Sequence, residues 1–195
     1  MPQRPSAARA TQLSAGPLSS SAGQVNHSDI LLTIAEIAVA LAGFSSLVTV
    51  IGRRSGDDES NTFSLFRLQL LLENALRNAA SALLPLPFLA TAANDPAMWR
   101  IASGLFRASN VLYTVITIRR GITVGVRPEV QWQQRILYSI WSVSFISAAL
   151  DVANVFGLGG QHAFSLFLAS LILAVCCTGL MFLMVAIEIF RVGRR

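Results

Sequence analysis

Five long apolar segments separated by short polar stretches restrict what this chain can fold into. A helix of about 20 mostly apolar residues is long enough to cross the hydrocarbon core of a bilayer. The segments cover residues 30–51, 68–93, 101–118, 136–156 and 163–190. The sequence therefore predicts an all-α, multi-pass transmembrane bundle of about five spans over residues 30–190. A flexible tail is predicted at residues 1–29 and a short basic tail at residues 191–195.

Composition agrees with a location in a membrane. Hydrophobic residues make up 53% of the chain and charged residues 13%, against about 25% charged in soluble domains. The net charge of +5 comes from fifteen basic residues, and all of them are arginines. Most of them flank apolar segments, so we expect anionic lipid headgroups at the cytoplasmic face, rather than nucleic acid, to be their partner.

The boundaries of the segments carry residues typical of helix ends. Asp95 followed by Pro96 predicts an N-cap and a first helical position at the start of the third span. The glycine-rich stretch at 157–160 predicts the end of the fourth span. Pro85 and Pro87 each remove a backbone hydrogen bond inside the second span, which predicts a kink toward its far end.

The arginines also predict an orientation, because short cytoplasmic loops carry an excess of basic residues. The stretches after the first, third and fifth spans together hold ten arginines. The two loops on the opposite side hold only Arg100. The N-terminus is therefore predicted outside and the C-terminus in the cytoplasm.

Three charged residues are predicted at one depth in the outer half of the bilayer. With a rise of 1.5 Å per residue, Glu36, Arg107 and Asp151 lie roughly 8–10 Å below the outer surface. Asn110 shares a helical stripe with Arg107, and Asn154 shares one with Asp151. Charges inside a membrane are candidates for function, but polar stripes also hold helices together. We therefore keep both a structural layer and a substrate or ion site as interpretations of these residues.

A second charged pair is predicted in the inner half. Glu73 and Arg77 are separated by four residues on the second span, a spacing at which side chains on one helix meet. We expect them to form an ion pair with each other. Small residues at the same spacing predict close helix packing on three spans. They are Ala38, Ala42 and Ser46, Gly104 and Ala108, and Ser170, Ala174 and Thr178.

Several kinds of chemistry are disfavoured. Without lysine, the chain cannot form a Schiff base with a cofactor. The histidines, His27 and His162, lie outside the predicted spans, which disfavours haem ligation, a metal site and an intramembrane serine protease. No glycine-rich phosphate-binding loop of the form GxxxxGK[ST] is present. The sequence predicts no enzyme, no cofactor and no metal site.

Two hypotheses of function follow. The first is a small membrane subunit that assembles with itself or within a larger membrane complex. The second is a transporter or channel-like protein that moves an ion or proton, with Glu36 or Asp151 as the carrier and Arg107 as the counter-charge. The lysine-free, arginine- and alanine-rich composition favours the cytoplasmic or inner membrane of a bacterium as the location.

Overall fold

The computed structural model describes residues 26–52, 58–92, 95–124 and 131–192. Within these ranges every element is helical, as the sequence predicts, and no strand is present. The predicted tail at 1–29 falls outside them, except that the first helix begins at His27. The terminal tail from residue 193 also lies outside the described residues.

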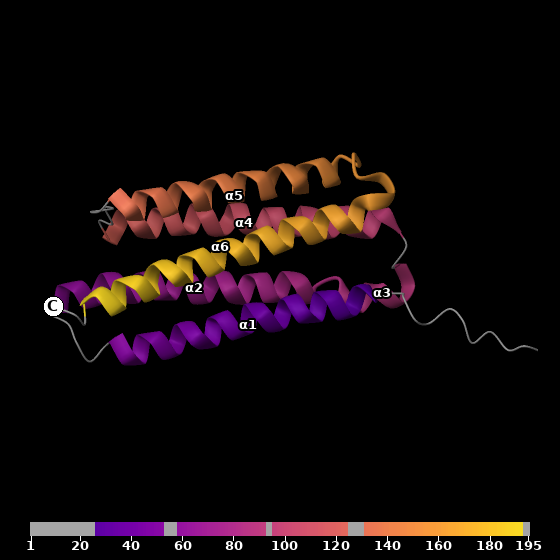
Figure 1. Cartoon of the computed structure of the whole chain (residues 1–195). Helices are drawn as coiled ribbons and strands as arrows, with labels where there is room; N and C mark the ends of the chain where they lie inside the picture. Colours follow the sequence, from indigo (N-terminus) through magenta and orange to yellow (C-terminus); the bar gives the residue numbers. More distant parts are fainter. Residues whose placement is uncertain (1–25, 53–57, 93–94, 125–130, 193–195) are drawn as a thin grey trace, which may run out of the picture.

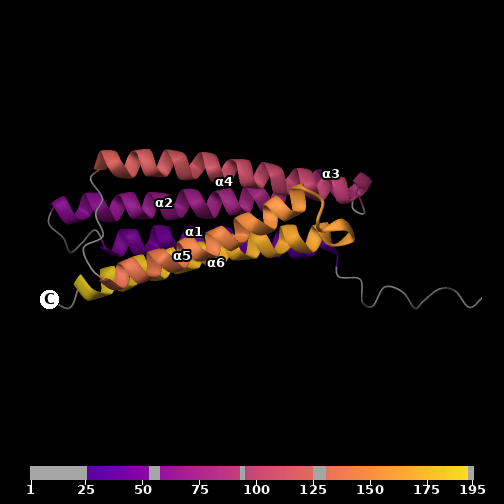
Figure 2. The ribbon, with the colours of Figure 1, turned by 90° about the horizontal axis from the view of Figure 1, so that it is seen from above.

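Five long helices and two short ones form a single bundle. They are α1 (His27–Gly52), α2 (Asp58–Leu83), α3 (Leu86–Ala92), α4 (Pro96–Val124), α5 (Gln131–Val155), η1 (Gly160–His162) and α6 (Ala163–Val192). The long helices lie side by side with nearly parallel axes in both ribbon views (Figures 1 and 2). The starts of α1, α4 and α6 meet at one end of the bundle (Figure 1).

The predicted helix ends are confirmed where the structure describes them. Helix α4 begins at Pro96, and the carboxylate of Asp95 accepts a hydrogen bond of 2.8 Å from the backbone N–H of Ala97. Pro85 lies between α2 and α3, so the second apolar segment is interrupted as expected.

The end of α5 is a Schellman turn around Gly157, whose φ of 79° is left-handed. Its N–H donates to the carbonyl of Asn154 and that of Leu158 to the carbonyl of Ala153, both at 2.9 Å. A Cβ at position 157 would lie 3.0 Å from Cζ of Arg100. Glycine is therefore required here both by the backbone conformation and by the approach of the guanidinium.

The interior is packed largely through small side chains. Helix α1 packs most extensively against α2, and α5 against α6. Buried alanines line the facing surfaces of α1 and α2 and allow the two backbones to approach closely. These alanines are Ala35, Ala38 and Ala42 on α1, and Ala75, Ala79 and Ala82 on α2. Phe106 on α4 and Phe167 and Leu171 on α6 fill the wider centre of the bundle.

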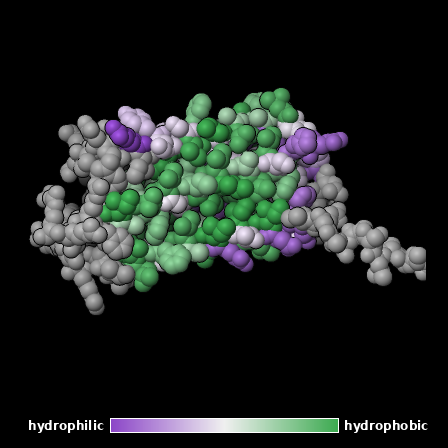
Figure 3. Space-filling model, viewed as in Figure 1, coloured by the Kyte–Doolittle hydropathy of each residue, from purple (hydrophilic) through white to green (hydrophobic). Residues whose placement is uncertain are grey.

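The outer surface is strongly apolar. Large hydrophobic side chains are exposed on all five long helices, among them Phe44, Leu76, Leu112, Phe145 and Leu183. Figure 3 shows hydrophobic residues covering most of the middle of the molecule on the face in view. In the described part of the chain three helical segments are long and apolar enough to cross a membrane. They are His27–Val48, Pro96–Arg120 and Gly160–Ile187.

Candidate functional site

A buried polar layer joins α4, α5 and α6 near the end where α4 and α6 begin. Its members are Ser103, Ser147, Asp151, Asn154 and Ser170, and we call them the Asp151 layer. Asn154 is fully buried, and its amide donates to the hydroxyl of Ser103 at 2.7 Å and to the carbonyl of Ala163 at 2.9 Å. One side chain of α5 thus contacts both α4 and α6.

Asp151 and Ser147 continue the layer toward the start of α5, and Ser170 of α6 lies beside them. The hydroxyls of Ser147 and Ser170 lie 2.9 Å apart and link α5 to α6. Asp151 is fully buried beside them, and its carboxylate interacts with the Ser170 hydroxyl but meets no donor in the described part of the chain at good hydrogen-bond geometry. A buried charge without hydrogen bonds is costly, so the acid is either neutral or balanced by a nearby cation.

A cation near Asp151 is Arg107 on α4. It lies within electrostatic range of Asp151, but the two groups form no ion pair among the described contacts. The side chain of Arg107 is half-buried and lines an outward-facing groove between α4 and α5. Asn110, which was predicted to extend this layer, donates to the carbonyl of Phe106 in its own helix at 2.9 Å.

Glu36 lies away from this layer, on the exposed surface of α1. Helix α1 buries the face that carries Leu31, Ala38 and Ala42. Glu36 precedes Ala38 by two residues, which is about 200° around the helix. The small-residue face takes the contacts with the bundle, so the carboxylate points outward. The sequence-based grouping of Glu36 with Arg107 and Asp151 within one chain therefore does not occur.

The level of Glu36 nevertheless matches that of Arg107. Aromatic contacts align the starts of three helices, because the ring of His27 lies 5.8 Å from Trp99 and 3.9 Å from Phe164 between centroids. Glu36 follows His27 by nine residues and Arg107 follows Trp99 by eight. At 1.5 Å per residue these are rises of about 14 and about 12 Å from the same end. Glu36 and Arg107 therefore lie at nearly the same level along the bundle axis, but on different faces of the bundle.

A second polar cluster connects α2 with α6. The hydroxyl of Thr178 accepts hydrogen bonds from the amides of Asn74 at 2.5 Å and Asn78 at 2.9 Å. It also donates to the carbonyl of Ala174 in its own helix at 3.1 Å. Thr178, Asn74 and Asn78 are all buried, and we call them the Thr178 cluster.

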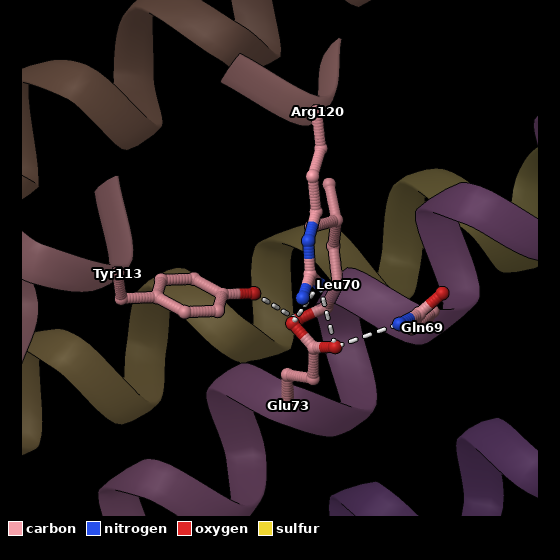
Figure 4. Close-up of polar contacts among 5 residues, drawn as sticks. All are labelled: Gln69, Leu70, Glu73, Tyr113 and Arg120. Carbon is pink, nitrogen blue, oxygen red and sulfur yellow. Dashed lines mark hydrogen bonds and ion pairs between the residues drawn. The ribbon is translucent and has the colours of Figure 1, made fainter. Parts of the chain in front are cut away.

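The inner-half pair has different partners from those predicted. Glu73 forms an ion pair of 3.0 Å with Arg120 on α4 and accepts a hydrogen bond of 2.8 Å from Gln69 (Figure 4). Arg77 donates to Asn74 and lies over the ring of Tyr113, with its Cζ 4.2 Å from the ring centroid. The expected Glu73–Arg77 pair is therefore wrong, because each side chain finds a partner elsewhere.

Three of these contacts could not be predicted from the sequence, each for a structural reason. The third predicted span ends at residue 118, before Arg120, whereas α4 continues to Val124 and carries this side chain on its surface. The hydroxyl of Tyr113 donates to the carbonyl of Leu70 at 2.8 Å, and no spacing rule predicts such a contact. The buried amides of Asn74 and Asn78 were visible in the sequence, but only the packing of α2 on α6 identifies Thr178 as their partner.

Within the described residues the arrangement consists mainly of polar contacts between helices. In the described ranges no three His, Cys, Asp or Glu side chains gather as metal ligands would. Cys177 is buried beside Ser144, and Cys176 is exposed. The described residues provide interhelical hydrogen bonds and the buried acid Asp151. They also place Glu36 and part of Arg107 on the apolar outer surface. No protein-family model, curated protein or solved structure matches the chain in the three comparisons.

Proposed function

We propose that this chain is a five-span integral membrane protein that serves as a small assembly subunit in a bacterial cytoplasmic membrane. Three segments already meet the length and apolarity of a membrane span. Helices α2 and α5 lie beside them with comparable lengths of 26 and 25 residues. Their polar side chains Asn74, Asn78, Asp151 and Asn154 are buried inside the bundle, while large apolar side chains such as Leu76 and Phe145 are exposed on the outside.

The arginine distribution supports an N-terminus outside and a C-terminus in the cytoplasm. The two loops at the bundle end near His27 and Trp99 hold one arginine, Arg100, whereas ten arginines follow the first, third and fifth apolar segments. Cysteines introduced at Gly56 and Gly125 should therefore be protected from an impermeant maleimide in intact cells, in a variant lacking Cys176 and Cys177. Cysteines at Ala97 and Gly160 should react. Ready external labelling at position 125 would overturn this orientation.

The observation that carries the assembly role is the exposed carboxylate of Glu36. It lies on an apolar helix and forms no hydrogen bond or ion pair with any residue that the structure describes. A charge in the bilayer core costs at least about 2.5–3.5 kcal/mol. Such a cost is offset when a second protein supplies a cation or a hydrogen-bond donor at this position.

Site-specific photocrosslinking tests the assembly role. A photoreactive amino acid at Ala40, one turn beyond Glu36, should form protein adducts in native membranes. The same amino acid at Ile172, an exposed position on α6, is the matched control and should react mainly with lipid. The protein adducts should disappear when Glu36 is changed to Gln. Lipid adducts alone at Ala40 would rule out an assembly role for this face.

The buried acid Asp151 favours a second candidate, proton- or cation-coupled transport. A fully buried carboxylate that meets no described donor at good hydrogen-bond geometry is suited to change its protonation during a transport cycle. Under this hypothesis the Asp151→Asn variant should insert and fold normally, yet lose a flux that the wild type shows in liposomes. A wild type without flux for a panel of ions and small solutes would exclude transport and leave the assembly role.

A further inference from the structure

We infer that the chain assembles with itself, and that the exposed face of α1 in one copy docks into the groove between α4 and α5 of a second copy, where Glu36 pairs with Arg107. This inference rests on the proposed assembly role and names the partner as a second copy. Three features of the structure carry it: a groove lined by a guanidinium without a direct hydrogen bond in the described ranges, a complementary helix face with a carboxylate, and a common level.

The groove runs along the outside of α4 and α5 and has a volume of about 600 Å³. Its walls are apolar apart from Arg107, and small residues form part of its α4 side. Gly104 and Ala108 supply these small residues, at the spacing that favours close approach of another helix. Gly104 packs toward Val155 of α5, since a Cβ placed on it would lie 3.7 Å from that side chain, whereas Ala108 is exposed and stays open to a second helix.

Arg107 is available to a partner. It forms no hydrogen bond or ion pair with the other residues in the described ranges, and part of its surface is open to the groove. Asp151 lies behind it within electrostatic range, on the buried side of α5. A guanidinium in this position has donors left over for a carboxylate that approaches from outside.

The exposed face of α1 has the matching properties. Glu36, Ala40 and Gly43 are spaced by four and three residues, and all three are exposed. A Cβ placed on Gly43 would meet no atom of the chain within 4 Å. The face therefore offers a carboxylate flanked by small side chains, which lets a neighbouring helix come close.

The two charges also lie at the same level, about 12–14 Å from the end of the bundle marked by the contact of His27 with Trp99. Copies in one membrane share their orientation, so α1 of one copy and α4 of the next run in the same direction. Glu36 then faces Arg107 without any shift along the membrane normal. In Figure 1 helix α1 and the pair α4 and α5 lie on opposite sides of the bundle. The contact is consequently heterologous, and repetition around an axis would close a ring.

Disulfide trapping between separately tagged copies tests this contact. Ala40 lies thirteen residues after His27, and Val111, which lines the groove, lies twelve after Trp99. Copies with Ala40→Cys should crosslink to copies with Val111→Cys when Cys176 and Cys177 are replaced by alanine in both. The control combines Ala40→Cys copies with copies that keep the exposed Cys176, which lies at nearly the same level on α6, and should give no crosslink.

Charge exchange tests the ion pair itself. Glu36→Gln should lower the crosslinked yield about tenfold or more, since a free charge in the membrane is costly. Glu36→Arg and Arg107→Glu should each assemble poorly alone, because like charges then meet. Copies of the two variants mixed together should crosslink to each other, since opposite charges meet again at each contact between them. Circular dichroism and gel filtration of each variant verify that it is folded.

The outcomes separate this inference from the proposed function. Crosslinks at Ala40 to a different protein, without trapping between copies, would overturn self-assembly and retain the assembly role. Lipid adducts alone at Ala40 would overturn both. Equal trapping of Ala40→Cys by Val111→Cys and by Cys176 would show that copies meet without the proposed geometry, and would also overturn the inference.

Discussion

Asn154 should be one of the most sensitive polar positions in the bundle. Its amide makes two good hydrogen bonds, to the hydroxyl of Ser103 on α4 and to the carbonyl of Ala163 on α6. Interhelical hydrogen bonds in membrane proteins contribute about 0.6 kcal/mol each on average. The space left by Asn154→Ala at a fully buried position adds a cavity cost of about 0.5–1 kcal/mol. We therefore expect the free energy of unfolding to fall by about 2 kcal/mol.

Asn110→Ala is the matched control. Asn110 lies on α4, is only half-buried, and bonds to the carbonyl of Phe106 in its own helix. Both substitutions replace asparagine by alanine in a helix, so the gain in helix propensity is similar and cancels in the comparison. We expect Asn110→Ala to change the unfolding free energy by less than about 0.5 kcal/mol.

Reversible unfolding in mixed micelles, followed by circular dichroism, measures both variants. A double-mutant cycle with Ser103→Ala should give a coupling energy to Asn154 of about 0.6 kcal/mol, and at most about 1.7 kcal/mol. The reasoning would be refuted if Asn154→Ala and Asn110→Ala had equal effects. Additive effects of Asn154→Ala and Ser103→Ala would show that this particular contact contributes nothing.

Two further predictions concern the turn after α5 and the pairing of Glu73. Gly157→Ala should destabilise the protein by about 1–3 kcal/mol, because φ is positive and the added Cβ meets Arg100. Gly160→Ala, also at positive φ but with open space around its Cβ, should cost less, and thermal unfolding in detergent checks the order. Glu73→Gln and Arg120→Met should show a coupling of about 0.2–1 kcal/mol that weakens with added salt, since both side chains are partly exposed. Glu73→Gln and Arg77→Met should be additive, and coupling in that second cycle would restore the pairing expected from spacing.

Local features were predictable from the sequence because local interactions cause them. Asp95 with Pro96, the proline at 85 and the glycine at 157 each fix backbone geometry within a few residues, and all three features occur where expected. The position of Asp151 and Asn154 on one stripe of α5 also follows from helical phase alone.

Features that depend on which helices are neighbours were not predictable. Helical phase shows that Glu36 and Ala38 lie on opposite sides of α1, but it does not tell which side meets the bundle. The alanine face is buried because it lets α1 approach α2 closely, and the carboxylate is excluded as a result. Glu73 likewise found Arg120 because the packing of α4 beside α2 brings the two side chains together, over a sequence separation of 47 residues.

The Thr178 cluster has a consequence for how the chain is made. The ribosome adds Asn74 to the chain 104 residues before it adds Thr178. Thr178 is the only described side chain outside α2 that bonds to the amide of Asn74. Until α6 emerges, the amides of Asn74 and Asn78 lack Thr178, and until α4 emerges Arg77 lacks the ring of Tyr113. A helix that carries these groups on its own partitions poorly into lipid. We therefore expect α2 to insert stably only some time after it has itself been synthesised. Until α6 arrives, α2 should remain near the translocation machinery. Nascent chains truncated before α6 should leave α2 extractable from the membrane by alkaline carbonate, whereas the full-length chain should resist extraction.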